Sequence, residues 1–246
     1  SKTQESFHIP ATITIKGEEY KVTSIKDYGF TVYGVYGKPS YTWEGTTYTT
    51  YTEGLEHICK NPNLKSVTFE LPSNIKKIGR FAFAGCTNLE EIVIPSSVEE
   101  MGTDVFRDCF ALKSVTFQTD EDGRASLKSL PWNCFYLCVN LTSLDLPEGL
   151  EKIDDYAIQC CLSLKSIHLP NSLKTIGGHF LCNAKSLTEL TIPASVTKID
   201  GAFLHGCESL RKVYLLGPAA TLGDTYSTED TSSSFEAFGA VSSAPG

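Results

Sequence analysis

Long apolar segments are missing from this chain. No stretch of its 246 residues approaches the roughly 20 consecutive apolar residues that a membrane-spanning helix needs. It also lacks the short motifs of common active sites: there is no H-E-x-x-H, no G-x-S-x-G and no phosphate-binding glycine loop. Its five histidines never lie at metal-ligand spacing with a third ligand nearby. We therefore expect no membrane span, no catalytic residues, no cofactor and no metal, and an enzyme is the least favoured class.

Positive charge is also scarce. The chain has 21 lysines and arginines against 29 aspartates and glutamates, for a net charge of -8, and its basic residues are scattered. Proteins that bind nucleic acids carry a basic patch, because neutralising phosphates supplies much of their affinity. Nucleic acid is therefore not an expected partner.

What the chain does have is an internal repeat of about 23 residues. Pro72 and Pro95 are 23 positions apart, and so are Pro147, Pro170 and Pro193. Each unit ends in the pattern L-x-x-[VIL]-x-[FIL], in which apolar side chains alternate as in a strand with one buried face. Seven such endings are present, and they begin at Leu64, Leu89, Leu112, Leu141, Leu164, Leu187 and Leu210.

The repeat predicts how the chain folds. A unit of this length cannot bury its own apolar face, so the units must stack on one another and share a continuous core. The proline after each strand lacks a backbone donor and ends strand pairing. A V-x-x-I segment then predicts a second, shorter strand. The A-F segment after it, such as Ala82-Phe83, predicts a short helical turn that packs an aromatic ring inward.

Nine cysteines, an odd number without any C-x-x-C pair, argue against a zinc site and against a simple disulfide framework. The repeat offers a different explanation, because five of them share one position, three residues before the repeat leucine. Two interpretations stay open: a ladder of buried free thiols, since cysteine buries as readily as a small apolar residue, or one or more disulfides between stacked neighbours. The five are Cys86, Cys109, Cys138, Cys161 and Cys207.

These features resemble a known family. The skeleton IPSSVEEMG…VF..C..L..V.F, as it stands in residues 94–117, is similar to the BspA-like leucine-rich repeats of surface proteins from Bacteroides and related bacteria and from Treponema. Residues 9–30 resemble the usual entry into such domains. The resemblance implies an α/β fold, a leucine-rich-repeat solenoid. It would be a curved right-handed superhelix with a parallel concave sheet, and with short strands and helical turns on its convex side.

The repeat also sets the expected domain boundaries. Residues 1–222 form the solenoid, with an N-terminal cap over 9–58 that includes a tyrosine-rich insertion, and with regular repeats over 59–216. Residues 223–246 are rich in serine, threonine, glycine and alanine, which indicates either a degraded final repeat or a flexible tail.

The tyrosine-rich insertion after Phe30 is the first candidate binding site. Its glycines and alternating residues predict one or two hairpin strands. Tyrosine and tryptophan are over-used at interfaces, because each has an apolar body and a polar tip. The insertion is therefore either a contact or sugar-stacking surface, or an element that covers the open end of the solenoid core. The candidate residues are Tyr33, Tyr36, Tyr41, Trp43 and Tyr48.

The outward positions of the expected concave sheet are mostly small, polar and uncharged. Binding hot spots favour tryptophan, tyrosine and arginine, which the middle repeats do not offer there. If this face binds a partner, its C-terminal end is favoured, with Asp145, His168, Lys212 and Tyr214 as candidates.

The repeat favours a non-catalytic protein-interaction module, and the resemblance implies that it is secreted or on the outer cell surface of a bacterium and adhesin-like. Its expected partner is a protein or glycan on a host or neighbouring cell. Two alternatives remain: a structural spacer or scaffold for a partner domain, and a carbohydrate binder that uses the tyrosine-rich insertion. We expect a monomer, and the resemblance implies a lipid anchor outside residues 1–246.

Overall fold

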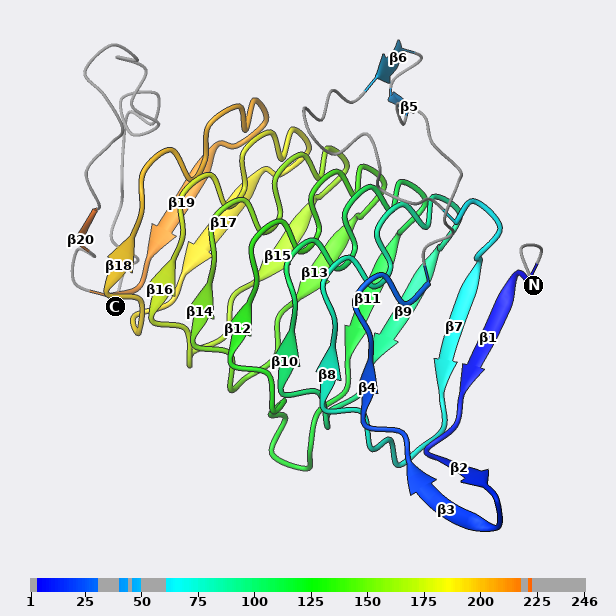
Figure 1. Ribbon diagram of the computed structural model, residues 1–246. Helices are drawn as coiled ribbons and strands as arrows, with labels where there is room; N and C mark the ends of the chain where they lie inside the picture. Colours follow the sequence, from blue (N-terminus) through cyan, green and yellow to red (C-terminus); the bar gives the residue numbers. More distant parts are fainter. Residues whose placement is uncertain (1–3, 31–39, 44–45, 50–60, 218–220, 223–246) are drawn as a thin grey trace.

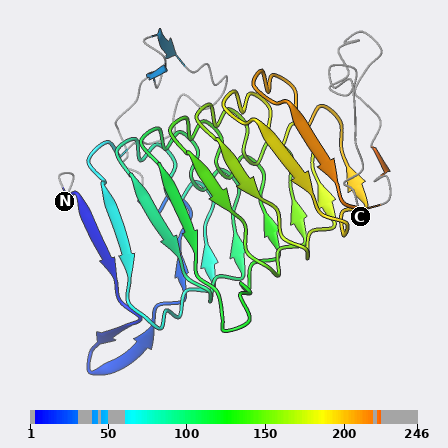
Figure 2. The ribbon, with the colours of Figure 1, turned by 180° about the vertical axis from the view of Figure 1, so that it is seen from behind.

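The computed structural model describes residues 4–30, 40–43, 46–49, 61–217 and 221–222. Two series of parallel strands run along opposite sides of the molecule (Figures 1 and 2). The series of longer strands contains β1 (Ser6–Ile9), β7 (Ser66–Phe69), β9 (Glu91–Ile94), β11 (Ser114–Phe117), β13 (Ser143–Asp145), β15 (Ser166–His168), β17 (Glu189–Ile192) and β19 (Lys212–Leu215).

The second series consists of two-residue strands on the opposite side of the molecule (Figure 1). One long strand, the following short strand and the turn after it make up what we call a rung. The short strands are β4 (Ser24–Ile25), β8 (Lys77–Ile78), β10 (Glu100–Met101), β12 (Ser129–Leu130), β14 (Lys152–Ile153), β16 (Thr175–Ile176), β18 (Lys198–Ile199) and β20 (Thr221–Leu222).

The predicted long strands are confirmed. Each of the seven begins two residues after its repeat leucine. The long strands pair in parallel, without a slip in register, as β1–β7, β9–β11, β13–β15 and β17–β19. Ile92 of β9 lies beside Val115 of β11, and Leu190 of β17 lies beside Val213 of β19. Their side chains are buried. The matching register keeps every apolar column facing the shared core. A slip of one residue would turn the apolar side chains of that strand towards solvent.

An additional rung precedes those that the leucine pattern marks. Strand β1 pairs with β7, and β4 pairs with β8. The pattern missed it because Gln4 stands where the other rungs carry leucine. A hairpin of β2 (Thr12–Ile15) and β3 (Glu18–Lys21) interrupts this rung and projects from the end of the solenoid (Figure 1). Within the expected cap, Ile9 and strand β4 therefore extend the two strand series.

The expected helical turns are not confirmed, since the described residues contain no helix. The segments in question are consecutive turns, each with left-handed residues that interrupt a right-handed helix. In one rung these residues are Asp104 and Asp108, at φ 58 and 59°, and in the next they are Asn133 and Leu137, at φ 54 and 61°. The turns bond to neighbouring rungs, and one example is the N–H of Phe106, which donates to the carbonyl of Cys134 at 2.9 Å.

Phenylalanine rings from successive turns form a column inside the core. Phe30, Phe83, Phe106 and Phe135 stack with ring centroids 4.8 to 5.3 Å apart and planes within 9° of parallel. This spacing is close to the distance between paired strands, so the rings stack because the rungs do. The inward aromatic that the sequence predicted is therefore confirmed.

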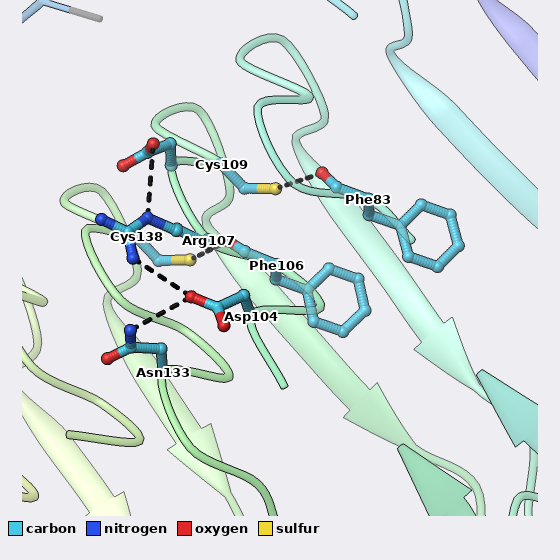
Figure 3. Close-up of polar contacts among 8 residues, drawn as sticks. Phe83, Asp104, Phe106, Arg107, Cys109, Asn133 and Cys138 are labelled. Atoms are coloured by element: carbon cyan, nitrogen blue, oxygen red, sulfur yellow. Dashed lines mark hydrogen bonds and ion pairs between the residues drawn. The ribbon is translucent and has the colours of Figure 1, made fainter. Parts of the chain in front are cut away.

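The cysteine column is a ladder of thiols that link one rung to the next. Cys109 donates its thiol proton to the carbonyl oxygen of Phe83, and Cys138 donates to that of Phe106, each with 3.2 Å between sulfur and oxygen (Figure 3). Cys161 and Cys207 repeat the contact in later rungs. The eight cysteines of the described residues are all free, which confirms the free-thiol interpretation for them. Cys59 lies outside the described residues.

Replacing one ladder thiol should weaken the fold. Cys138→Ala removes a donor to the carbonyl of Phe106 and leaves a small void in a close-packed core, so we expect the free energy of unfolding to fall by about 1–2 kcal/mol. Urea unfolding followed by circular dichroism measures this. Cys160→Ala is the matched control, because Cys160 is only partly buried and outside the column, and should cost less than about 0.5 kcal/mol. Equal losses would contradict the ladder's role.

The thiols also predict how stability depends on pH. Burial raises the pKa of Cys207 from 9.0 to about 11 and that of Cys182 to about 12. The folded state therefore keeps these protons above pH 9, while the unfolded chain loses them. The thiols' contribution to the free energy of unfolding is thus complete below pH 9 and declines as pH rises through these pKa values.

Burial should also protect the thiols from reagents. In a Cys59→Ser background, Ellman's reagent at pH 8 should react only slowly with the native protein. After denaturation it should react with eight thiols. Rapid reaction of buried thiols in the native protein would contradict this.

Candidate binding surfaces

The tyrosine-rich insertion contains the hairpin that its sequence predicts. Strand β5 (Ser40–Trp43) pairs antiparallel with β6 (Thr46–Thr49), and the register places Tyr41 beside Tyr48 and Trp43 beside Thr46. The side chains of these residues, and all of Tyr33 and Tyr36, lie outside what the structure describes. The choice between a cap and a binding surface therefore stays a prediction.

The candidates at the C-terminal end of the long-strand face form two groups. Asp145 of β13 and His168 of β15 are direct partners on neighbouring strands, and both are exposed. Lys212 and Tyr214 lie on β19, where Lys212 is the partner of Glu189 and Tyr214 is the partner of Thr191. Strand β17 separates the two groups, so the structure brings the four residues onto one face without gathering them into one site.

An apolar hollow lies at the other end of the same face, and sequence reasoning missed it. It encloses about 200 Å³ between β7, β9 and the segments that follow them. Leu71 and Val93 are exposed at 58% and 40%, which is unusual beside a column of threonines. The signal was present, since Val93 occupies an outward position that carries threonine in β7 and β11. The lining residues are Val67, Thr68, Phe69, Leu71, Val93, Pro95 and Gln118.

A second hollow, of about 340 Å³, lies on the short-strand face across β14, β16 and β18. Trp132 stands at one side of it with 42% of its surface exposed. We call this hollow the trough. Its other lining residues are Lys152, Ile153, Asp154, Asp155, Thr175, Ile176, Gly177, Lys198 and Asp200.

A buried charge cluster occupies the turns of two middle rungs (Figure 3). The Nη1 atom of Arg107 lies 3.1 Å from Oδ1 of Asp104, and its Nε atom lies 3.7 Å from Oδ2 of Asp108. Asn133 donates to the same Asp104 oxygen, and the guanidinium of Arg107 lies 4.6 Å from the ring centroid of Tyr136. All three charged side chains are at most 5% exposed. Because solvent hardly reaches these groups, we assign the cluster to the fold and not to ligand binding.

The described part of the chain carries neither a candidate metal site nor a candidate membrane-spanning helix. It contains no group of three or more histidine, cysteine, aspartate or glutamate residues that could hold a metal ion. It also has no helix long and apolar enough to cross a membrane.

Comparison with known proteins gives a family. The sequence matches the family described as the BspA-type leucine-rich repeat region, in six copies over residues 56–123 and 123–226. The chain belongs to this family. Repeats of this kind generally act as protein-interaction modules, and the similar solved structures are repeat proteins too. No curated protein matches the chain.

Three solved structures illustrate the likeness. A leucine-rich repeat protein from Bacteroides ovatus is 26% identical with a TM-score of 0.63, and the match covers 86% of this chain and 47% of that one. One from Eubacterium ventriosum is 32% identical with a TM-score of 0.52, over 59% of this chain and 37% of that one. The leucine-rich repeat protein of Treponema pallidum is 25% identical with a TM-score of 0.57, over 65% and 72%. The chain thus spans less than half the length of the first two.

Removing the arginine of the charge cluster should destabilise the protein strongly. Arg107→Met leaves the carboxylates of Asp104 and Asp108 buried without their cation, so we expect the free energy of unfolding to fall by about 3–5 kcal/mol. Arg80→Met is the matched control: Arg80 is exposed and lies over the ring of Phe81 at 5.6 Å, and its loss should cost about 1 kcal/mol or less. Chemical denaturation measures the free energy of unfolding of both variants. Equal losses would show that the buried charge cluster stabilises the fold no more than an exposed arginine does.

Proposed function

We propose that this chain is a non-catalytic binding module, secreted or on the cell surface, that attaches to a protein of a host or neighbouring cell. Its family supports the general role, because leucine-rich repeats usually serve in protein interaction. The solenoid supports it physically, since stacked rungs present a long surface of regularly spaced side chains.

The observation that carries the proposal is the apolar hollow at the N-terminal end of the long-strand face. Protein interfaces combine an apolar centre with a polar rim, and binding energy concentrates where a side chain fills a desolvated pocket. Leu71 and Val93 supply exposed apolar surface at the hollow, while Thr68 and Gln118 supply polar groups beside it. The site therefore suits one apolar anchor side chain of a partner protein.

One observation favours a second candidate function. The solved relatives from Bacteroides and Eubacterium are more than twice as long as the matched region, which fits a repeat segment that holds another part of a larger protein at a distance. In that role the long-strand face would need no partner of its own.

The apolar hollow gives a direct test. Biolayer interferometry against a panel of host extracellular-matrix proteins should find at least one partner, and Leu71→Asp or Val93→Asp should weaken its binding by at least about tenfold, or about 1.4 kcal/mol. An introduced carboxylate would have to lose its hydration against an apolar anchor. Thr191→Asp, also at an exposed position and farther along the outward column of Val93, is the control and should change affinity less than twofold.

Two results would count against the proposal. Binding that both hollow variants leave unchanged would place the contact elsewhere on the chain. No binding to any matrix protein would favour the spacer function.

A further inference from the structure

The trough on the short-strand face lies where a glycine stands between two aspartates on successive rungs. In the rungs of β14 and β18 the residue after the short strand is an aspartate, Asp154 or Asp200, but in the rung between them it is Gly177. There is no room for a side chain there, since a Cβ atom on Gly177 would lie 2.5 Å from the backbone nitrogen of Asp155. Gly177 thus lets the two rungs pack closely and places no side chain between the carboxylates of Asp154 and Asp200.

Trp132 forms a wall of the trough. The equivalent position carries Arg80 or Thr103 in earlier rungs and Asp155 or Gly178 in later ones, so the repeat itself does not require an aromatic residue here. The indole packs edge-on against Tyr156, with ring centroids 6.1 Å apart. Tyr156 in turn stacks on His179 at 4.8 Å. These contacts hold Trp132 in place while 42% of its surface stays open to solvent.

The polar groups of the trough alternate between donors and acceptors. Lys152 pairs with Asp154 at 2.6 Å, and Lys198 pairs with Asp200 at 2.8 Å. Asp155 accepts a hydrogen bond from the backbone N–H of Gly178 at 2.8 Å, which orients its carboxylate. Ammonium groups only donate and carboxylates only accept, so a ligand that spans the trough must do both.

This combination selects among chemical classes of ligand. A cation would meet two lysine ammonium groups, and a phosphate would meet three carboxylates. A hydroxyl group both donates and accepts, and a sugar ring has several hydroxyls around an apolar face of C–H groups. Such a face packs well on an exposed indole, and a few convergent polar groups beside an aromatic wall are typical of small-molecule sites.

We propose that the trough bounded by Trp132, Thr175 and Asp200 binds a saccharide ring of a glycan. The ring stacks on Trp132, and its hydroxyls bond to the lysine and aspartate side chains of β14 and β18. This site lies on the face opposite the apolar hollow (Figures 1 and 2), so the inference does not depend on the proposed protein partner.

A glycan array tests the proposal, followed by isothermal titration of the full chain with the best-retained oligosaccharide. The wild-type chain should retain at least one glycan class. Trp132→Ala, which removes the stacking surface, and Thr175→Arg, which fills the trough, should each weaken binding by at least about tenfold. Tyr20→Ala is the matched control, because Tyr20 is an exposed aromatic residue on β3, and it should change affinity less than twofold.

Circular dichroism shows whether each variant is folded, and the two trough variants act by different means, so loss of folding in one leaves the other as a test. Retention of no glycan by the wild-type chain overturns the proposal. So does glycan binding that folded Trp132→Ala or Thr175→Arg leaves unchanged, which would point to the tyrosine-rich insertion. Leu71→Asp should leave glycan binding intact, so that this site and the protein-binding hollow succeed or fail separately.

Discussion

The structure depends on the inability of a single rung to bury its own apolar face. A rung of about 23 residues has a core only when another rung lies on each side of it. Hydrogen bonding follows the same rule, because backbone groups in the turns and thiols in the core find partners on the neighbouring rung. Stability is therefore shared along the axis, and a contact broken in one rung weakens the two beside it.

This dependence explains why the repeat positions vary so little. The phenylalanine column, the thiol ladder and the left-handed turn residues all form contacts between rungs. A substitution at any of them therefore also removes a contact of the neighbouring rung. Positions that point to solvent are free of this constraint. Val93, Leu71 and Trp132 depart from their neighbours at such positions, and the two hollows lie there. The scaffold and the binding surfaces thus use different residues of the same rungs.

The sequence predicted the scaffold better than the surfaces, for a physical reason. Burial in stacked rungs requires apolar residues at regular intervals, and such a period is visible in a single sequence. The repeat leucines therefore located seven long strands correctly. The first rung was missed because Gln4 breaks that period. The helical turns are not confirmed: left-handed residues such as Asp104 and Leu137 interrupt them, and the sequence did not mark these positions because they are not glycine.

The hollows escaped prediction because each is formed by residues from several rungs, and no single unit shows them. Trp132 and Gly177 are far apart in the sequence, and they line the same trough only because stacking brings their rungs close together. Two of the candidate residues, Asp145 and His168, are direct neighbours, since both lie in one outward column whose register the repeat sets. The aromatic insertion follows no period, and its role stays a prediction.

Native-state hydrogen exchange tests the dependence of each rung on its neighbours most directly. If rungs are stable only together, the amides of β11, β13 and β15 should exchange by global unfolding, and protection should decline towards β1 and β19 at the two ends. Exchange from the middle strands as fast as from the end strands would contradict the account, because it would show that each rung opens on its own.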